Sequence, residues 1–193
     1  MKLDEFLPVH DVAETYSIRI DASPERVWTQ LLNADFAGLP VARRLMALRS
    51  FGRRKPPESE PHTLATLTSG GGKGGFVELA RMPGEEIVLG IIGRFWRPDA
   101  PVLRDWKAAE FVAMSPPGQA KAAWNFYLQS DAGATILSTE TRVQCCGQAA
   151  RIKFHLYWAL IGFFSGWIRK EILKMVKQNC ESAAGLTHNT GQL

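Results

Sequence analysis

The sequence predicts an α+β fold in which an antiparallel sheet holds one long C-terminal helix. Two runs of alternating polarity, residues 120–130 and 134–144, flank turn residues 131–133 and predict a β-hairpin. Residues 149–184 follow as one long helical run, almost wholly apolar over residues 154–168 and amphipathic and basic afterwards. A β-hairpin followed by a long helix is typical of a fold in which the sheet curves around the helix. Such a fold often has a cavity between the sheet and the helix.

Composition fits one globular domain. The chain has 193 residues, of which 46% are hydrophobic and 22% are charged, enough for a single core and unlike a disordered chain. Six Trp and ten Phe must mostly be buried in a core, a pocket or an interface. We expect one domain over residues 1–193, with a folded core over 12–184, a flexible linker over 51–62 and a loose tail over 185–193.

The N-terminal third predicts one strand followed by two short helices. Residues 14–22 alternate in polarity and predict a half-buried strand. Its inward face would carry Tyr16, Ile18 and Ile20. Ser23 can cap and Pro24 can begin a helix that ends near residue 33, and a second helix is expected over 39–48.

The middle of the chain predicts several strands joined by glycine- and proline-rich turns. Glycines in residues 70–75 match a dinucleotide fingerprint, but a strand over 76–82 follows instead of the helix that such a site needs. Residues 86–96 are apolar on both faces, which predicts a strand covered on both sides or curled. A helical turn over 106–109 and a strand over 110–115 precede the final hairpin.

The hairpin strands separate an apolar face from a polar face. The first strand places Ala122, Trp124, Phe126 and Leu128 on the apolar face, which the second strand continues with Thr135, Leu137, Thr139, Thr141 and Val143. Glu140 and Arg142 fall on the opposite face beside Asn125 and Tyr127, where we expect a cross-strand charge network. The helices would then pack on one face of the sheet.

Several segments resemble the START-like, or helix-grip, superfamily of ligand-binding and polyketide-cyclase-type proteins, and most of all a bacterial subgroup of it. They are the strand-to-helix entry over residues 20–28, the segments 89–96, 120–126 and 137–143, and the terminal helix over 157–169. The resemblance covers residues 12–184. It implies a curved antiparallel sheet wrapped around the C-terminal helix, with two short helices after the first strand. The superfamily includes lipid carriers, hormone receptors, aromatases, oxygenase subunits and chaperone cofactors, so the resemblance implies a fold more than an activity.

A cavity in such a fold would be lined by the inner faces of the sheet and the helix. The predicted ligand-binding residues are Trp96, Trp124, Phe126, Leu137 and Thr139 from the sheet, and Leu156, Leu160, Phe164 and Trp167 from the helix. The helical members follow a spacing of i, i+4, i+8 and i+11, which places them on one side. Alternatively, these side chains fill the space and form a solid core.

Two residues are candidates for polar or catalytic contacts. His155 could donate to a ligand carbonyl or act as a general acid or base, and otherwise lies on the helix surface or in the core. Arg94 could pair with a ligand carboxylate, and otherwise forms a salt bridge or lies at an exposed strand end. Gly162 and Gly166 would let the helix lie close to the sheet or leave room for a ligand. The sequence contains no recognisable metal-ligand spacing, and we expect no metal and no cofactor.

Charge, cysteine content and hydropathy limit the kinds of partner and the cellular location that we expect. The net charge is +4, and basic residues cluster over residues 43–55 and 169–177, but a nucleic-acid-binding surface would be more densely basic or interleaved with aromatic residues. Three cysteines without a paired spacing predict reduced thiols in a cytoplasmic protein. The N-terminus lacks a signal peptide, and the apolar stretch of residues 154–168 is shorter than a membrane span.

The expected function is the binding of a hydrophobic or aromatic small molecule, lipid- or polyketide-like, as a carrier or sensor. The first alternative is a polyketide cyclase or aromatase that uses the same cavity. The second is a ligand-free module with weak peripheral contact to a membrane, or to a protein, through a basic helix face. That face would comprise Arg169, Lys170, Lys174 and Lys177.

Overall fold

A computed structural model describes residues 1–36, 63–64, 75–97 and 102–187, with side chains described as far as Ser182. The elements are α1 (Leu3–Phe6), β1 (Val12–Ile20), α2 (Pro24–Asn33), β2 (Val77–Met82), β3 (Glu86–Gly93), the short 3₁₀ helix η2 (Ala108–Glu110), β4 (Ala120–Asp131), β5 (Ala134–Cys145) and α5 (Gln148–Thr187). The expected helix over 39–48, the linker over 51–62, most of the glycine-rich run and the tail beyond Thr187 lie outside the described residues.

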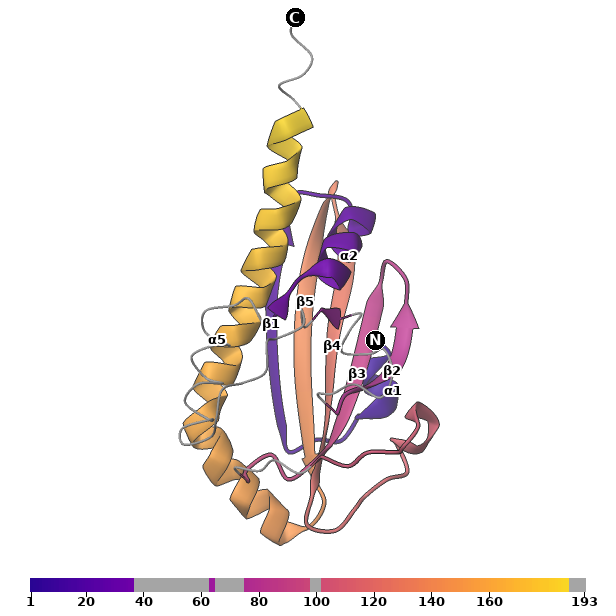
Figure 1. Ribbon diagram of the computed structural model, residues 1–193, viewed down its shortest axis with the longest axis vertical. Helices are drawn as coiled ribbons and strands as arrows, with labels where there is room; N and C mark the ends of the chain where they lie inside the picture. The colour runs from indigo at the N-terminus through magenta and orange to yellow at the C-terminus, as the bar shows by residue number, and fades with distance from the viewer. Residues whose placement is uncertain (37–62, 65–74, 98–101, 188–193) are drawn as a thin grey trace, which may run out of the picture.

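The described strands form one antiparallel sheet in the order β1-β5-β4-β3-β2, with α5 lying along it (Figure 1). The register pairs Phe126 with Thr139 and Thr139 with Tyr16, so the predicted inner face runs across three strands. The chain is therefore an α+β protein with an open antiparallel sheet and a long C-terminal helix. This confirms the predicted fold class and is consistent with a helix-grip fold.

Helices α2 and α5 cover the inner face of the sheet and form the largest hydrophobic cluster with it. Val27 and Leu31 of α2, and Ile172 and Val176 of α5, are buried against the inner face. Helix α2 begins at Pro24 as predicted, although the side chain of Ser23 makes no capping hydrogen bond. The apolar stripe of each helix thus supplies the tertiary burial from which helices in proteins gain most of their stability.

The outer face of the sheet is also covered, which is one of the two alternatives that the apolar segment 86–96 left open. Leu3 and Leu7, with Trp106 and Phe111 from the segment before β4, form a second hydrophobic cluster on β3 and β4. The expectation that helices pack on one face only is therefore wrong. Because both faces are covered, β3 can be apolar on both sides, as predicted: Leu89 belongs to the first cluster and Val88 to the second.

The predicted strand over residues 110–115 is wrong. This segment contains the end of η2 and a turn instead. The Glu110 side chain accepts a hydrogen bond from the backbone N–H of Lys107 at 2.7 Å, which closes the η2 turn. The Phe111 ring then packs on the Trp106 ring, with 5.5 Å between centroids, so burial of two aromatic side chains overrides the local alternation.

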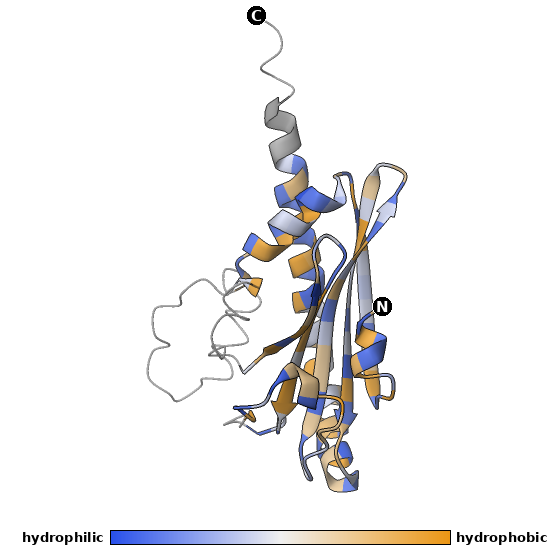
Figure 2. Cartoon of the chain, turned by 90° about the vertical axis from the view of Figure 1, so that its right-hand side faces the viewer, coloured by the Kyte–Doolittle hydropathy of each residue, from blue (hydrophilic) through white to orange (hydrophobic). Residues whose placement is uncertain are grey.

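The strands show the polar and apolar alternation that the sequence predicts, visible as alternating colours along the sheet in Figure 2. On the polar side, Arg142 donates to Glu140 at 2.6 Å and contacts Asp4 at 2.7 Å. Glu140 and Arg142 therefore interact on the outer face as predicted, but the ion pair lies within β5 and extends to α1, so the predicted cross-strand arrangement is wrong. Glu86 strengthens the attachment of α1, because its carboxylate accepts the backbone N–H of Lys2 at 2.6 Å.

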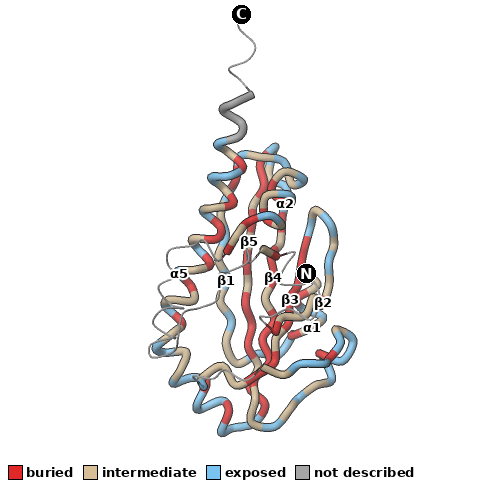
Figure 3. The backbone as a smooth tube through the Cα atoms, viewed as in Figure 1, coloured by how far each residue is buried: buried red, intermediate tan, exposed pale blue. Residues whose placement is uncertain are grey.

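The inner face of α5 differs from the predicted one. Leu156 and Leu160 are 71% and 72% exposed, and Trp167 is 40% exposed, so the expectation that they face the sheet is wrong. Buried positions lie instead on a different side of the helix, as the alternation of burial along α5 in Figure 3 indicates. They are Ala150, Phe154, Gly162, Gly166, Arg169, Ile172, Leu173, Val176 and Cys180. Within the described residues, no helix is long and apolar enough to cross a membrane.

Candidate functional site

A hollow of about 360 Å³ lies where the sheet meets the beginning of α5. It is lined by Arg94, Trp96, Arg97, Gly118 and Lys153. These residues come from three segments: the turn after β3, the loop before β4 and the first turns of α5. Two of them, Arg94 and Trp96, are residues that the sequence singled out for ligand contact.

Local backbone structure shapes this hollow. The turn after β3 closes when the N–H of Arg97 donates to the carbonyl of Arg94 at 3.0 Å. On the other side of the hollow, the loop before β4 is fixed by a backbone hydrogen bond. The Cys146 carbonyl accepts the Gly118 N–H at 2.9 Å. Gly118 has a φ of +70°, a conformation that favours glycine. Both loops are thus anchored by backbone bonds, and the side chains that line the hollow project from defined positions.

The hollow combines an aromatic wall with positive charge. Trp96 is half-buried and packs against the cluster that contains Phe154 and Trp158. Arg94 and Lys153 have no side-chain hydrogen bond or ion pair with any described residue. A guanidinium and an ammonium beside an indole ring offer charge-assisted hydrogen bonds to an anion and a flat surface to a ring.

Three of the predicted ligand-binding residues lie buried on the inner face of the sheet. Phe126, Leu137 and Thr139 are completely buried, and the Phe36 ring stacks on Phe126 with 6.2 Å between centroids. Trp124 is only half-buried, and its indole N–H donates to the Thr139 hydroxyl at 2.7 Å. That hydroxyl donates in turn to the carbonyl of Asn125 at 2.7 Å. This chain of bonds orients the Trp124 ring across the inner face.

A polar cluster lies between β1 and α5. The Arg169 guanidinium contacts Glu14 at 3.3 Å and donates to the Ser165 hydroxyl at 3.0 Å, and the Tyr16 hydroxyl donates to Glu14 at 3.3 Å. Burial lowers the pKa of Arg169, because the charged form loses hydration. Burial and the neighbouring Glu14 carboxylate together raise the pKa of Tyr16. The sequence placed Arg169 on an exposed basic face, and the structure instead buries it against the sheet.

Thr141 is an unusual residue on the same inner face. It lies opposite Glu14 on β1 and opposite Trp124 on β4. Its hydroxyl oxygen is buried and has no hydrogen-bond partner among the described residues. A buried hydroxyl without a partner costs stability, so this position is one where the fold is not optimised for stability alone.

The remaining predicted site residues lie apart from the hollow. His155 is exposed on α5, with its ring at the edge of Phe154. Phe164 is half-buried, and Leu156, Leu160 and Trp167 face outward. The structure therefore brings Arg94 together with Trp96 and adds Lys153 to them. Lys153 was not predicted, because its place in the hollow depends on which side of α5 packs on the sheet. The apolar stretch of residues 154–168 does not indicate that side.

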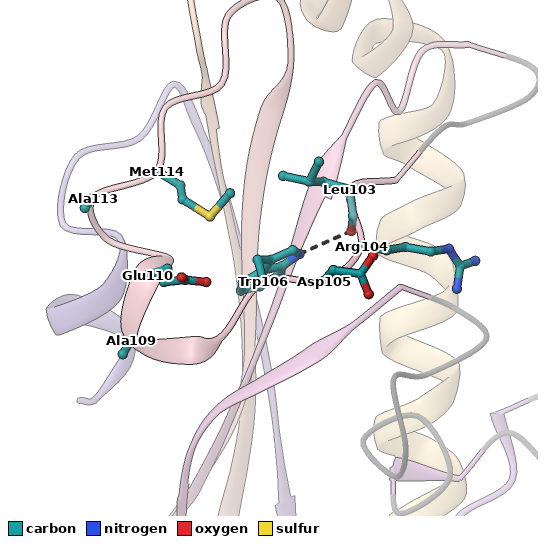
Figure 4. A pocket seen from close by; sticks show the side chains of 8 residues that line it. All are labelled: Leu103, Arg104, Asp105, Trp106, Ala109, Glu110, Ala113 and Met114. Carbon is teal, nitrogen blue, oxygen red and sulfur yellow. Dashed lines mark hydrogen bonds between the residues drawn. The ribbon is translucent and has the colours of Figure 1, made fainter.

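A second hollow, of about 610 Å³, lies on the outer side of the protein and is drawn in Figure 4. It is lined by Leu103, Arg104, Asp105, Trp106, Ala109, Glu110, Ala113 and Met114. The Trp106 indole donates to the carbonyl of Leu103 at 3.2 Å, so its polar atom is satisfied within the segment. Five of the eight lining residues are exposed, which makes this hollow a surface depression.

The thiols and potential metal ligands do not indicate a reactive centre. All three cysteines are free and buried, and burial raises the pKa of Cys145 to about 12, with Asp11 contributing. That thiol is protonated at neutral pH and therefore a poor nucleophile. The described residues contain no group of three or more His, Cys, Asp and Glu side chains that could hold a metal ion.

Comparisons with known proteins give only distant structural likenesses. No family model and no curated protein matches the sequence. DynU16, from the dynemicin biosynthetic locus, is 16% identical, with a TM-score of 0.39 over 90% of this chain and 48% of its own. This chain thus spans about half the length of DynU16.

CalU16 from Micromonospora echinospora is 14% identical, with a TM-score of 0.31 over 92% of this chain and 88% of its own. Protein MLL2253 from Mesorhizobium loti is 13% identical, with a TM-score of 0.39 over 86% and 95% of the two chains. At such scores the fold assignment rests on the topology of the chain itself.

Proposed function

We propose that this protein binds a hydrophobic or aromatic small molecule that carries an anionic group, and acts as its carrier or sensor. A lipid- or polyketide-like acid would fit this description. The observation that carries the proposal is the hollow between the sheet end and α5, where Trp96 lies beside Arg94 and Lys153. Its volume of about 360 Å³ is at the lower end of the range for small-molecule sites.

The chemistry of the hollow defines how the ligand would bind. The ring or chain of the ligand would lie on Trp96, where the favourable term is burial of apolar surface. Its carboxylate would face Arg94, whose planar guanidinium can donate two parallel hydrogen bonds. Because Arg94 and Lys153 have no carboxylate partner among the described residues, an incoming anion would not have to displace any of the described carboxylates.

A matched pair of ligands separates these two contributions. The purified protein would first be examined by native mass spectrometry, with organic extraction of any bound compound. Calorimetric titration would then compare 2-naphthoate with 2-naphthamide, which share a ring system and differ in charge. We expect the acid to bind at least about tenfold more tightly than the amide, the size expected for one charge-assisted contact.

Two arginine variants test where the carboxylate binds. Arg94→Met should weaken naphthoate binding about tenfold or more and leave naphthamide binding nearly unchanged. Arg104→Met is the matched control, because Arg104 is an exposed arginine outside this hollow, and it should change neither affinity. Equal affinities for acid and amide in the wild type, or equal losses in both variants, would contradict the proposed site.

A further inference from the structure

The outer face of α5 carries a continuous row of large apolar side chains. Its members are Ile152, Leu156, Leu160, Phe163 and Trp167, exposed by 57%, 71%, 72%, 77% and 40%. These five are the majority of the eight large hydrophobic residues that the described part of the chain exposes. Apolar exposure is therefore concentrated on one surface, whereas scattered exposed residues would need no explanation.

The spacing of these residues makes the row a helix face. Intervals of four, four, three and four residues keep successive side chains on one side of an α-helix. At about 1.5 Å per residue, the row is roughly 22 Å long. We call these five residues the outer row. The opposite side of α5 already packs on the sheet through residues such as Phe154 and Leu173, so the core does not require the outer row.

Positive charge flanks the outer row. Residues 148–170 contain no Asp or Glu, while Lys153 and Lys170 are exposed near its two ends. Neither lysine has an ion pair with a described residue, and the Lys170 ammonium lies 5.0 Å from the centre of the Tyr16 ring. Arg151 adds a charge at the beginning of α5, although it is paired with Asp11 at 2.7 Å.

We propose that the outer row of α5 docks onto the surface of an anionic lipid bilayer. The helix would lie parallel to the membrane, with the apolar row in the boundary between headgroups and acyl chains. Lys153 and Lys170 would contact anionic headgroups, which attract basic residues near the surface. Trp167 suits this depth because its ring is apolar and its N–H is polar. This mode needs no membrane-spanning helix, and it does not depend on the ligand proposal.

The charge pattern favours a bilayer over a second copy of the chain. Antiparallel pairing of two outer rows would bring Lys153 of one copy near Lys170 of the other, and parallel pairing would place identical lysines together. Either arrangement brings like charges together at both ends of the contact, and the nearby carboxylates of Glu171 and Asp11 are already paired with Lys174 and Arg151. An anionic membrane supplies the missing negative charge.

Vesicle flotation of the full chain tests the proposal. Vesicles of phosphatidylcholine alone would be compared with vesicles that contain about 30 mol% phosphatidylglycerol, in low and in high salt. We expect flotation with the anionic vesicles that decreases as salt rises. The double variant Leu160→Ser/Phe163→Ser should lower the partition coefficient at least about tenfold, because two of the largest exposed side chains are removed. Val9→Ser/Val112→Ser is the matched control, since both residues are exposed outside α5, and it should float like the wild type.

A charge variant and a mass measurement complete the test. Lys170→Glu should weaken binding to anionic vesicles, whereas Lys107→Glu, at an exposed lysine outside α5, should not. Light scattering should show a monomer without lipid. The proposal would be overturned by the absence of flotation, by equal binding to neutral vesicles, or by a dimer that Leu160→Ser/Phe163→Ser dissociates. Both serine changes are at exposed positions, and a circular dichroism spectrum would verify that the variants are folded.

Discussion

At the scale of single residues, the inner face of the sheet contains two threonines with opposite roles. The Thr139 hydroxyl accepts the indole N–H of Trp124 and donates to the carbonyl of Asn125. The Thr141 hydroxyl, two residues further along β5, is equally enclosed but has no partner among the described residues. The alternation of the strand predicts the face on which both lie, whereas hydrogen bonding depends on which neighbours the fold brings near.

Replacing each threonine by valine should therefore have opposite effects on stability. Thr141→Val removes a buried hydroxyl without breaking a hydrogen bond, and should raise the free energy of unfolding by up to about 1 kcal/mol. Thr139→Val leaves the Trp124 N–H without its acceptor, and should lower the free energy of unfolding by about 1–3 kcal/mol. Urea denaturation followed by Trp fluorescence measures both, and a loss of stability in Thr141→Val would mean that its hydroxyl is satisfied.

At the scale of elements, the two glycines of α5 have different neighbours: Gly162 packs on Trp158 of the same helix, and Gly166 packs on Tyr16 of β1. Gly162 and Gly166 are both buried. A Cβ atom added at Gly166 would clash with the Tyr16 hydroxyl and lie 3.0 Å from the Cζ atom that bears it. Close approach of α5 to β1, which the sequence left as one of two explanations for these glycines, is thus what Gly166 permits. It also allows Arg169 to reach Glu14.

Gly166→Ala tests this close approach. In an exposed helix the change would stabilise by about 1 kcal/mol, because alanine has the higher helix propensity. Here we expect a net loss of about 1–2 kcal/mol, because the Tyr16 ring must move away from α5. In a Tyr16→Phe background, which removes the atom that the new methyl group meets first, the loss should shrink. A double-mutant cycle by urea denaturation measures this coupling, and independent effects of the two changes would contradict it.

At the scale of the whole molecule, hydrophobic clusters pack on both faces of the same sheet. The inner cluster packs α2 and α5 on the sheet, and the outer cluster packs α1 and the segment before β4 on the other side. Leu3 of the outer cluster is completely buried although it is only the third residue of the chain. The outer layer should therefore contribute to the stability of the inner one.

Leu3→Ala should lower the stability of the whole molecule. Truncation of a fully buried leucine costs about 2–5 kcal/mol, a large fraction of the stability of a typical domain. The far-ultraviolet signal, to which α5 contributes most, and the Trp fluorescence should shift together in urea, since both layers share one sheet. Val9→Ala, at a residue that is 69% exposed, should change little. Two separate transitions would show that the outer layer unfolds independently.

Most of the fold follows from local patterns in the sequence. Alternation in residues 14–22, 120–130 and 134–144 predicts β1, β4 and β5, because side chains of a strand point to alternate faces. The same alternation places Glu140 and Arg142 together on the outer face, where they form an ion pair within β5. The failure at residues 110–115 has an equally physical cause, since burial of Phe111 against Trp106 outweighs a short alternating run.

The candidate site was predicted only in part. Arg94 and Trp96 lie close together in the chain, and both line the hollow. Lys153, Gly118 and the orientation of α5 are brought there by the tertiary structure. Phe154 can be assigned to the buried side at helical spacing only once the structure shows that Leu173, Val176 and Cys180 are buried.

By itself, the sequence determined the class of fold, the inner and outer faces of its main strands, and the presence of one long terminal helix. These properties follow from the periodicity of polar and apolar residues, which can be recognised within short segments of the sequence. Only the tertiary structure decided which side of the apolar stretch faces the sheet, because residues 154–168 are apolar nearly all round and several rotations would bury similar area. Packing of Gly166 on Tyr16 and pairing of Arg169 with Glu14 select one rotation. That rotation leaves the outer row exposed and brings Lys153 to the hollow beside Arg94.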